Sequence, residues 1–186
     1  MKKTLLIALL CMISAFGMEA TAQANKSTNK SSSPTYVLAD FRGIKWGAHV
    51  DSIKVDGKKL TFTKSADITD KNAYTLANDD MTIGTVNVDK IYYIFNANGR
   101  FNGVMVIGKK ELGTKKQFGE MKYILKYKFG EPELKEITGG VQYYWMVDDV
   151  RITLDDQDAQ GTFTLEFYSD FERSESKRIN TNVDDF

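Results

Sequence analysis

Strict alternation of apolar and polar residues governs the last third of this chain. Residues 141–147 and 150–154 alternate with a period of two, and only two aspartates separate them. A period of two indicates strands, and a two-residue connection joins antiparallel neighbours in a hairpin. The pairing predicts an apolar face on which Trp145 lies opposite Ile152. The opposite face, predicted to meet solvent, carries Tyr144, Met146, Arg151 and Thr153.

Three further segments alternate in the same way. Residues 162–169 are predicted to form a strand, and its inward-facing residues are Phe163, Leu165 and Phe167. Residues 60–64 and 73–77 show the same period over a shorter length and are predicted as two more strands.

A second hairpin is predicted from residues 91–95 and 101–107. A three-residue loop at 97–99 sets Phe95 opposite Phe101 and gives a glycine the left-handed position that such loops favour. It also sets Ile91 opposite Met105. The face so defined holds Ile91, Tyr93, Phe95, Phe101 and Met105, and the reverse face holds Tyr92, Ile94, Val104 and Val106.

Both faces of this second hairpin are therefore apolar, although a half-solvated strand should alternate. Either a second layer buries the reverse face, which we favour, or the face is an exposed patch that binds a partner. In the exposed case, Tyr92 and Tyr144 are the candidate ligand-binding residues.

Residues 115–129 have the pattern of an amphipathic helix. Thr114 and Gln117 match a capping box at its start, and Gly130 followed by Pro132 marks its end. The apolar stripe consists of Phe118, Met121, Ile124 and Leu125. One face of this helix should therefore pack on a sheet.

These elements predict an α+β fold, with an antiparallel sheet of about six or more strands and one principal helix packed on a face. The chain also suggests two similar β-rich halves, each a helical segment followed by hairpin strands. Residues 50–53 precede the strands at 91–107 in one half, and residues 114–129 precede those at 141–169 in the other.

The first 24 residues have the three-part pattern of a secretory signal peptide. Two lysines precede an apolar run at residues 4–16, and small residues then place cleavage after Ala22 or Ala24. The run is too short for a permanent span. The pattern predicts a periplasmic or secreted protein with no stable membrane span after cleavage.

Three regions follow the predicted leader. Residues 25–35 are rich in Ser, Asn and Lys and are predicted to be a flexible linker. Residues 36–171 are predicted to form a single α+β domain, and residues 172–186 a polar C-terminal tail.

Cleavage would remove Cys11, the one cysteine of the 186 residues. The mature protein would then have no disulfide, and core packing alone would stabilise it. The 25 basic residues balance the 25 acidic ones, so the composition predicts no general attraction to nucleic acid or anionic membrane. We expect a monomer that needs no cofactor and no metal to fold.

Two short motifs resemble a known group of proteins. Residues 41–47 read FRGIKWG, and residues 129–132 read FGEP. The chain thereby resembles small exported proteins of Gram-negative bacteria that open with F-R-G-x-x-W-G and carry a later helix ending in (Y/F)-G-x-P. The resemblance implies export and fold but no particular chemistry. On physical grounds, Trp46 is predicted to fill the core and Gly47 to form a tight turn.

The chain lacks the residues that several kinds of catalysis require. Zinc sites use three or four Cys or His ligands, and the chain beyond the leader keeps only His49. Without a cysteine, thiol nucleophiles and redox dithiols are excluded. A Ser-His-Asp triad would need Asp51 and Ser52 on opposite sides of the imidazole, yet both follow on one short turn. We therefore expect His49 to be a solvent-exposed residue of this turn.

A hydrolase that uses paired carboxylates remains a hypothesis, because a site of this kind has almost no recognisable sequence pattern. The three pairs are Asp79-Asp80, Asp148-Asp149 and Asp155-Asp156, and solvated turns are their commoner role. Residues 156–161 also resemble the start of a calcium loop, in which Asp156 and Asp158 are candidate ligands. Gln160 at position five departs from that pattern, so we favour an ordinary acidic loop.

Two functions therefore stand as hypotheses. The first is an exported, non-catalytic binding or protein-interaction module of the bacterial envelope, whose partner is an envelope or extracellular protein or glycan. The alternative is a carboxylate-based hydrolase that acts on envelope glycans or peptides. A cleft with two convergent carboxylates would favour the enzyme, and an aromatic surface without such a pair would favour the module.

Overall fold

A computed structural model describes residues 38–110, 115–138, 140–157 and 161–172. The predicted signal peptide (1–24), the linker (25–35) and residues 173–186 of the tail lie outside the described residues. The chain divides into two units, Met1–Pro34 and Thr35–Phe186, and all described residues belong to the second.

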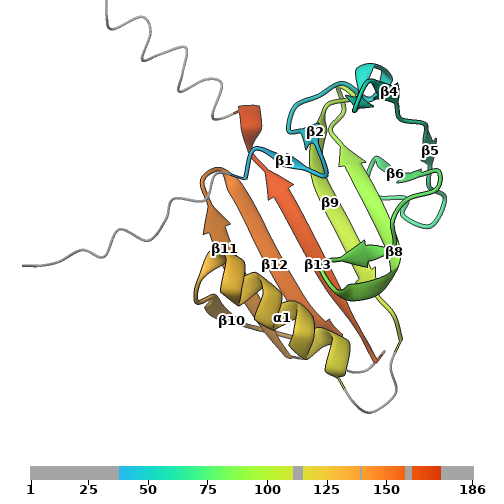
Figure 1. The fold of residues 1–186 in the computed structure, drawn as a ribbon. Helices are drawn as coiled ribbons and strands as arrows, with labels where there is room; N and C mark the ends of the chain where they lie inside the picture. The colour runs from blue at the N-terminus through green and yellow to red at the C-terminus, as the bar shows by residue number, and fades with distance from the viewer. Residues whose placement is uncertain (1–37, 111–114, 139, 158–160, 173–186) are drawn as a thin grey trace, which may run out of the picture. The chain divides into compact units, whose positions relative to one another are not determined.

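One nine-stranded antiparallel sheet dominates this unit (Figure 1). Its strands are, in spatial order, β10 (Glu133–Ile137), β11 (Gly140–Val147), β12 (Val150–Gln157), β13 (Thr162–Ser169), β9 (Phe101–Gly108), β8 (Val86–Phe95), β6 (Ala73–Leu76) and β5 (Phe62–Lys64). The ninth, β7 (Thr82–Ile83), pairs with β8 beside this path. The helix α1 (Lys116–Phe129) lies across one face (Figure 1). The predicted α+β class is confirmed.

Two four-stranded meanders make up the sheet. The first runs through β5, β6, β8 and β9, the second runs through β10 to β13, and β9 pairs antiparallel with β13 where they meet. A 3₁₀ turn, η1 (Val50–Ser52), precedes the first meander, and α1 precedes the second. The order of elements is the one expected for two similar β-rich halves.

The start of α1 corrects the predicted capping box. The N-cap is Lys115, whose backbone is left-handed with φ 45° and whose side chain makes no capping bond. Thr114, the predicted cap, lies outside the described residues. Lys115 instead reaches Asp156, with 2.8 Å between its Nζ and Oδ2 of the carboxylate. A tertiary ion pair thus joins the helix start to β12, which local spacing does not reveal.

The end and the buried stripe of α1 agree with prediction. Gly130 has φ 86° and donates its amide to the carbonyl oxygen of Lys126 at 2.9 Å. Met121 and Leu125 are buried, while the flanking Phe118 and Ile124 are half-buried. Gly130 thus ends the helix where the sequence places it, but as the C-cap with ψ −167°, outside the left-handed helical conformation that was predicted.

The register of the β11–β12 hairpin is confirmed. Val147 pairs with Val150 and Trp145 with Ile152. Trp145 and Ile152 are buried, but Thr153 on the opposite face is also buried, at 7% exposed. The expectation that this whole opposite face meets solvent is therefore wrong at Thr153, because β13 adds a further strand beside it.

A β-bulge corrects the predicted faces of the β8–β9 hairpin. Phe95 pairs with Phe101 as predicted, and Asn96 donates to the carbonyl oxygen of Arg100 across the three-residue loop at 2.9 Å. The register then shifts between the pairs at Ile94 and Phe95. A bulge adds one residue to one strand and moves its later side chains to the other face.

The shift changes the partners that follow. Ile91 pairs with Val106, and Met105 pairs with Tyr92, so the predicted pair of Ile91 with Met105 is wrong. Val104 and Val106 are buried on the same face as Phe101, and Met105 lies on the other. The predicted reverse face of Tyr92, Ile94, Val104 and Val106 is therefore divided between the two sides of the sheet.

The segment before β5 packs over the first meander on the same side as α1 (Figure 1). It contains β1 (Asp40–Phe41), β2 (Ile44–Lys45), η1, β3 (Lys54–Val55) and β4 (Lys58–Lys59). Trp46 is half-buried and stacks on Phe101, with 4.8 Å between ring centroids. Gly47 has φ 83°, and a Cβ there would lie 3.0 Å from the ring of Phe171. This residue needs both the left-handed backbone and the small volume of glycine.

Within the ranges that the structure describes, no helix is long and apolar enough to cross a membrane.

Candidate functional site

The two faces of the sheet have different surroundings. The covered face, which includes Tyr93, Val104, Trp145, Ile152 and Phe167, packs against α1 and the segment before β5. The open face carries the intervening residues, among them Tyr92, Met105, Tyr144, Thr153 and Glu166. Side chains of a strand alternate between faces, so each row of cross-strand partners belongs to one face only.

A loop between β5 and β6 covers the β8 end of the open face. Asp67 in this loop accepts hydrogen bonds from the hydroxyl of Tyr92 at 3.0 Å and from Lys90 at 2.7 Å. These bonds hold the pKa of Asp67 below its ordinary value, and that of Lys90 above it. Farther along the loop, Lys71 forms an ion pair with Glu166 at 2.7 Å. The loop is therefore attached to both meanders.

The two sequence-predicted contact residues lie on this same face. Tyr144, Thr153, Glu166, Met105 and Tyr92 form one continuous row of cross-strand partners from β11 to β8. The β5–β6 loop buries Tyr92 to 3% exposed, whereas Tyr144 at the other end of the row is half-buried. Burial, followed by the bond to Asp67, raises the pKa of Tyr92. Of the two, Tyr144 is the residue that a partner can reach.

Two adjoining hollows mark the uncovered part of the open face. The polar hollow has a volume of about 310 Å³ and is lined by Lys135, Gln142, Tyr144, Arg151, Thr153 and Glu166. The apolar hollow has about 470 Å³, and the open-face residues that give it this character are Ile94, Met105 and Tyr168. Arg151 and Glu166 line both. A partner that fills one hollow therefore borders the other.

Cations in the polar hollow rest on aromatic rings. Lys135 places its Nζ 3.6 Å from the ring centroid of Tyr144, and Arg151 places its Cζ 5.0 Å from that of Tyr168. Such contacts hold a cation in place without neutralising its charge. Outside the lining but on the same face, burial raises the pKa of Asp155, and the charge of Glu166 raises it further.

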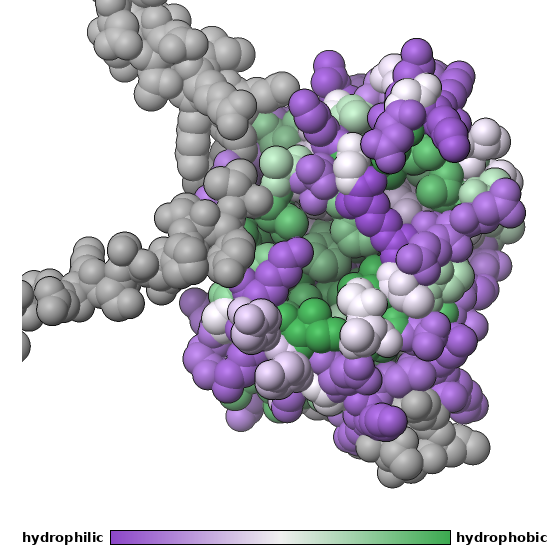
Figure 2. Space-filling model, in the orientation of Figure 1, coloured by the Kyte–Doolittle hydropathy of each residue, from purple (hydrophilic) through white to green (hydrophobic). Residues whose placement is uncertain are grey.

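A third hollow, of about 570 Å³, opens on the other side between α1 and the β1 and β7 strands. Figure 2 shows apolar side chains gathered in it. Its charged lining consists of Asp40, Arg42 and Lys128. Arg42 is already paired, as described next, and Asp40 accepts the amide of Gly43 at 3.0 Å. The lining thus has no uniform charge with which to select a ligand.

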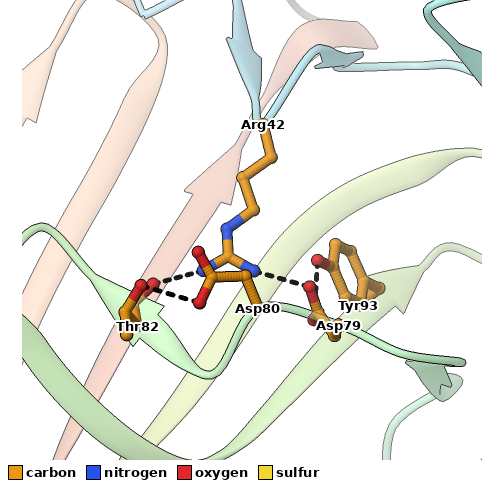
Figure 3. A network of polar contacts seen from close by, with 5 residues as sticks. All are labelled: Arg42, Asp79, Asp80, Thr82 and Tyr93. Carbon is orange, nitrogen blue, oxygen red and sulfur yellow. Dashed lines mark hydrogen bonds and ion pairs between the residues drawn. The ribbon is translucent and has the colours of Figure 1, made fainter.

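Arg42 belongs to a structural network on the covered side (Figure 3). Its Nη1 donates to Oδ1 of Asp79 at 2.6 Å, and its Nη2 donates to the carbonyl oxygen of Thr82. The hydroxyl of Tyr93 donates to the other oxygen of Asp79 at 2.9 Å. Burial raises the pKa of Tyr93 well above its ordinary value. This network ties the β1–β2 turn to β8 and leaves Asp79 no free oxygen for catalysis.

The other predicted catalytic residues do not converge. Nδ1 of His49 lies 3.5 Å from a carboxylate oxygen of Asp51, but the hydroxyl of Ser52 donates to the backbone carbonyl oxygen of His49. No hydroxyl of this turn is therefore activated by the imidazole. The side chain of His49 is 50% exposed, as expected.

The remaining carboxylate pairs lie in a turn and in a strand. Asp148, with φ 51°, and Asp149 make the turn between β11 and β12, the commoner role expected for such a pair. Asp155 lies on the open face, whereas Asp156 pairs with Lys115 beside α1. Neighbours in a strand point to opposite faces, so Asp155 and Asp156 do not form one site.

The calcium candidate is only partly described. Asp156 is engaged by Lys115, and Asp158 lies outside the described residues. Among the residues with described positions, no three His, Cys, Asp or Glu side chains gather as a metal site.

Sequence reasoning missed the residues that line the polar hollow together with Tyr144. Alternation placed Arg151 and Thr153 on one face, but the strand that carries Lys135 was not predicted, and no neighbour was predicted for the strand that carries Glu166. The order of strands in the sheet brings these four side chains together. No spacing along the chain indicates that order.

The fold and the open face together define an antiparallel α+β protein with one helix-packed side and one side that carries two adjoining hollows. Comparison with known proteins found no matching family model, no matching curated protein and no matching solved structure.

Proposed function

We propose that this protein is an exported, non-catalytic binding module of the bacterial envelope that holds a protein partner on its open face. The contrast between the two faces carries the proposal, since one is packed by α1 and the other offers two adjoining hollows. Centres of protein interfaces are rich in aromatic residues, Met and Arg. The open face supplies Tyr144, Tyr168, Met105, Met146 and Arg151.

Exposure on this face supports the same proposal. Met146 is 58% exposed and Tyr168 is 42% exposed, and both belong to one row of cross-strand partners with Arg151. Large apolar side chains gathered around hollows on a surface usually mark a partner site.

Export is supported by the leader pattern of residues 1–24. It is supported as well by the resemblance of residues 41–47 to the opening of small exported proteins of Gram-negative bacteria. The partner is therefore to be sought in the envelope or outside the cell. The apolar hollow favours a protein partner over a glycan, because it can accommodate an apolar side chain.

The hydrolase alternative would have to use Asp155 and Glu166, the carboxylates that the open face brings near each other. Glu166 is held by Lys71, and Asp155 lines neither hollow. A general acid must reach the bond that it protonates, so this arrangement favours binding.

Capture from an envelope extract tests the proposal, with the protein purified after export by its own leader. Tyr168→Ala on the open face should weaken capture of the partner at least tenfold, the loss typical of an aromatic residue at an interface centre. Tyr127→Ala is the matched control, because Tyr127 is 83% exposed on α1. Loss of capture by the control alone would move the binding surface to the helix and contradict the proposal.

A further inference from the structure

We propose that the polar hollow is a subsite for a carboxylate side chain of the partner, and that the apolar hollow beside it takes an aromatic side chain two residues away. In an extended chain, residues i and i+2 point to the same side, so one strand of the partner can fill both hollows. This inference rests on the proposed function and names the chemistry that the partner must present.

Two unpaired cations line the polar hollow. Among the described residues, neither Lys135 nor Arg151 has a carboxylate within ion-pair distance, although both are fixed above tyrosine rings. The one anion in the lining, Glu166, is already paired with Lys71 at 2.7 Å. The hollow therefore keeps a positive charge that an incoming carboxylate would meet.

Hydroxyl donors in the lining add to this charge. Thr153 lines the hollow, and its hydroxyl can donate a hydrogen bond to a carboxylate there. The hydroxyl of Tyr144 lines the same hollow and can donate to the same carboxylate.

The neighbouring apolar hollow is the basis for the second group that the partner must present, an aromatic side chain. Ile94, Met105 and Tyr168 line it, and it meets the polar hollow at Arg151 and Glu166. The hollow has a volume of about 470 Å³, which leaves room for an apolar side chain of the partner.

Three peptides test the inference against the exported full chain: acetyl-Glu-Ala-Phe-amide, acetyl-Gln-Ala-Phe-amide and acetyl-Glu-Ala-Ala-amide. Binding is followed by NMR shifts of the protein at low salt. The first peptide should bind about tenfold more tightly than either of the others, because each lacks one of the two groups. Its shifts should map to β11, β12 and β13. Equal affinity for the Glu and Gln peptides would overturn the carboxylate assignment, as would tighter binding of inorganic phosphate.

Variants provide the second arm. Lys135→Gln combined with Arg151→Gln should abolish the preference for Glu over Gln, and both side chains are exposed, so the fold should persist. Lys122→Gln is the matched control, because Lys122 also lies over a ring, 5.0 Å from the centroid of Tyr143, but on the covered side. A preference that survives the double variant would refute the subsite.

The two proposals can fail separately. If Tyr168→Ala prevents capture from the extract while the double variant captures normally, the open face binds a partner but the carboxylate subsite is wrong. If the peptide preference is found and depends on Lys135 and Arg151 but no protein is captured, the subsite stands and the proposed function is wrong.

Discussion

Tyr144 and Trp145 are consecutive residues of β11 that point to opposite faces of the sheet. The indole nitrogen of Trp145 donates to the carbonyl oxygen of Gly130 at 2.8 Å, which attaches the end of α1 to the covered face. Tyr144 lies on the open face with Lys135 over its ring. One residue therefore anchors the helix, and its neighbour lines the polar hollow.

Truncation of these two side chains should have unequal costs. Trp145→Ala should lower the free energy of unfolding by about 3–5 kcal/mol, because it removes a buried aromatic and leaves a cavity. Tyr144→Ala should cost much less, because its ring is half-buried on the open face. Urea denaturation of both variants measures the difference. Equal costs would mean that the faces of β11 are wrongly assigned.

The bulge in the β8–β9 hairpin predicts opposite outcomes for two adjacent residues. Val104→Asp should unfold the protein at 25 °C, because Val104 is 1% exposed on the covered face and an unpaired charge would be buried there. Met105→Gln should leave the protein folded and weaken partner capture, since Met105 lines the apolar hollow. Circular dichroism distinguishes the two. A folded Val104→Asp variant would contradict the register after the bulge.

The Arg42–Asp79–Tyr93 network predicts an asymmetry within the Asp79-Asp80 pair. Asp79→Asn should destabilise the fold by about 1–3 kcal/mol, because it weakens a buried ion pair and one hydrogen bond. Asp80→Asn is the control, because Asp80 is exposed and, among the residues with described positions, its side chain bonds only to the Thr82 hydroxyl at 2.8 Å. Thermal unfolding of both should show a shift for Asp79 alone; a catalytic pair would instead leave stability unchanged in both variants.

Asp155 makes stability depend on pH. Its pKa is raised in the folded protein, so folding disfavours the ionised form, and stability falls as pH rises from the unfolded value of about 3.9 through the folded one. Asp155→Asn should therefore raise the melting temperature at pH 7 by roughly 1–2 °C, as for a partly exposed group. The gain should disappear at pH 3.

The control for that prediction is Asp156→Asn. This change breaks the ion pair with Lys115 and should give no gain at pH 7. A gain in both variants would indicate that removing any negative charge stabilises the protein, and that burial of Asp155 is not the cause.

Local patterns predicted the elements that depend on nearby residues. The β11–β12 register follows from alternation on both sides of a two-residue turn, and the end of α1 follows from Gly130. The face of β9 could not be predicted in the same way. Its bulge is observed only in the pairing with β8, so the alternation of residues 101–107 gave the wrong side for Met105.

The sequence by itself determined the α+β class, the hairpins and the buried face of α1, because period, turns and caps act over a few residues. Tertiary structure alone decided which side chains share the candidate site. Lys135, Thr153 and Glu166 are brought together by the order of β10 to β13, and Tyr92 is buried by a loop some 25 residues earlier in the chain. Contacts between distant segments depend on packing the whole sheet, which no short pattern encodes.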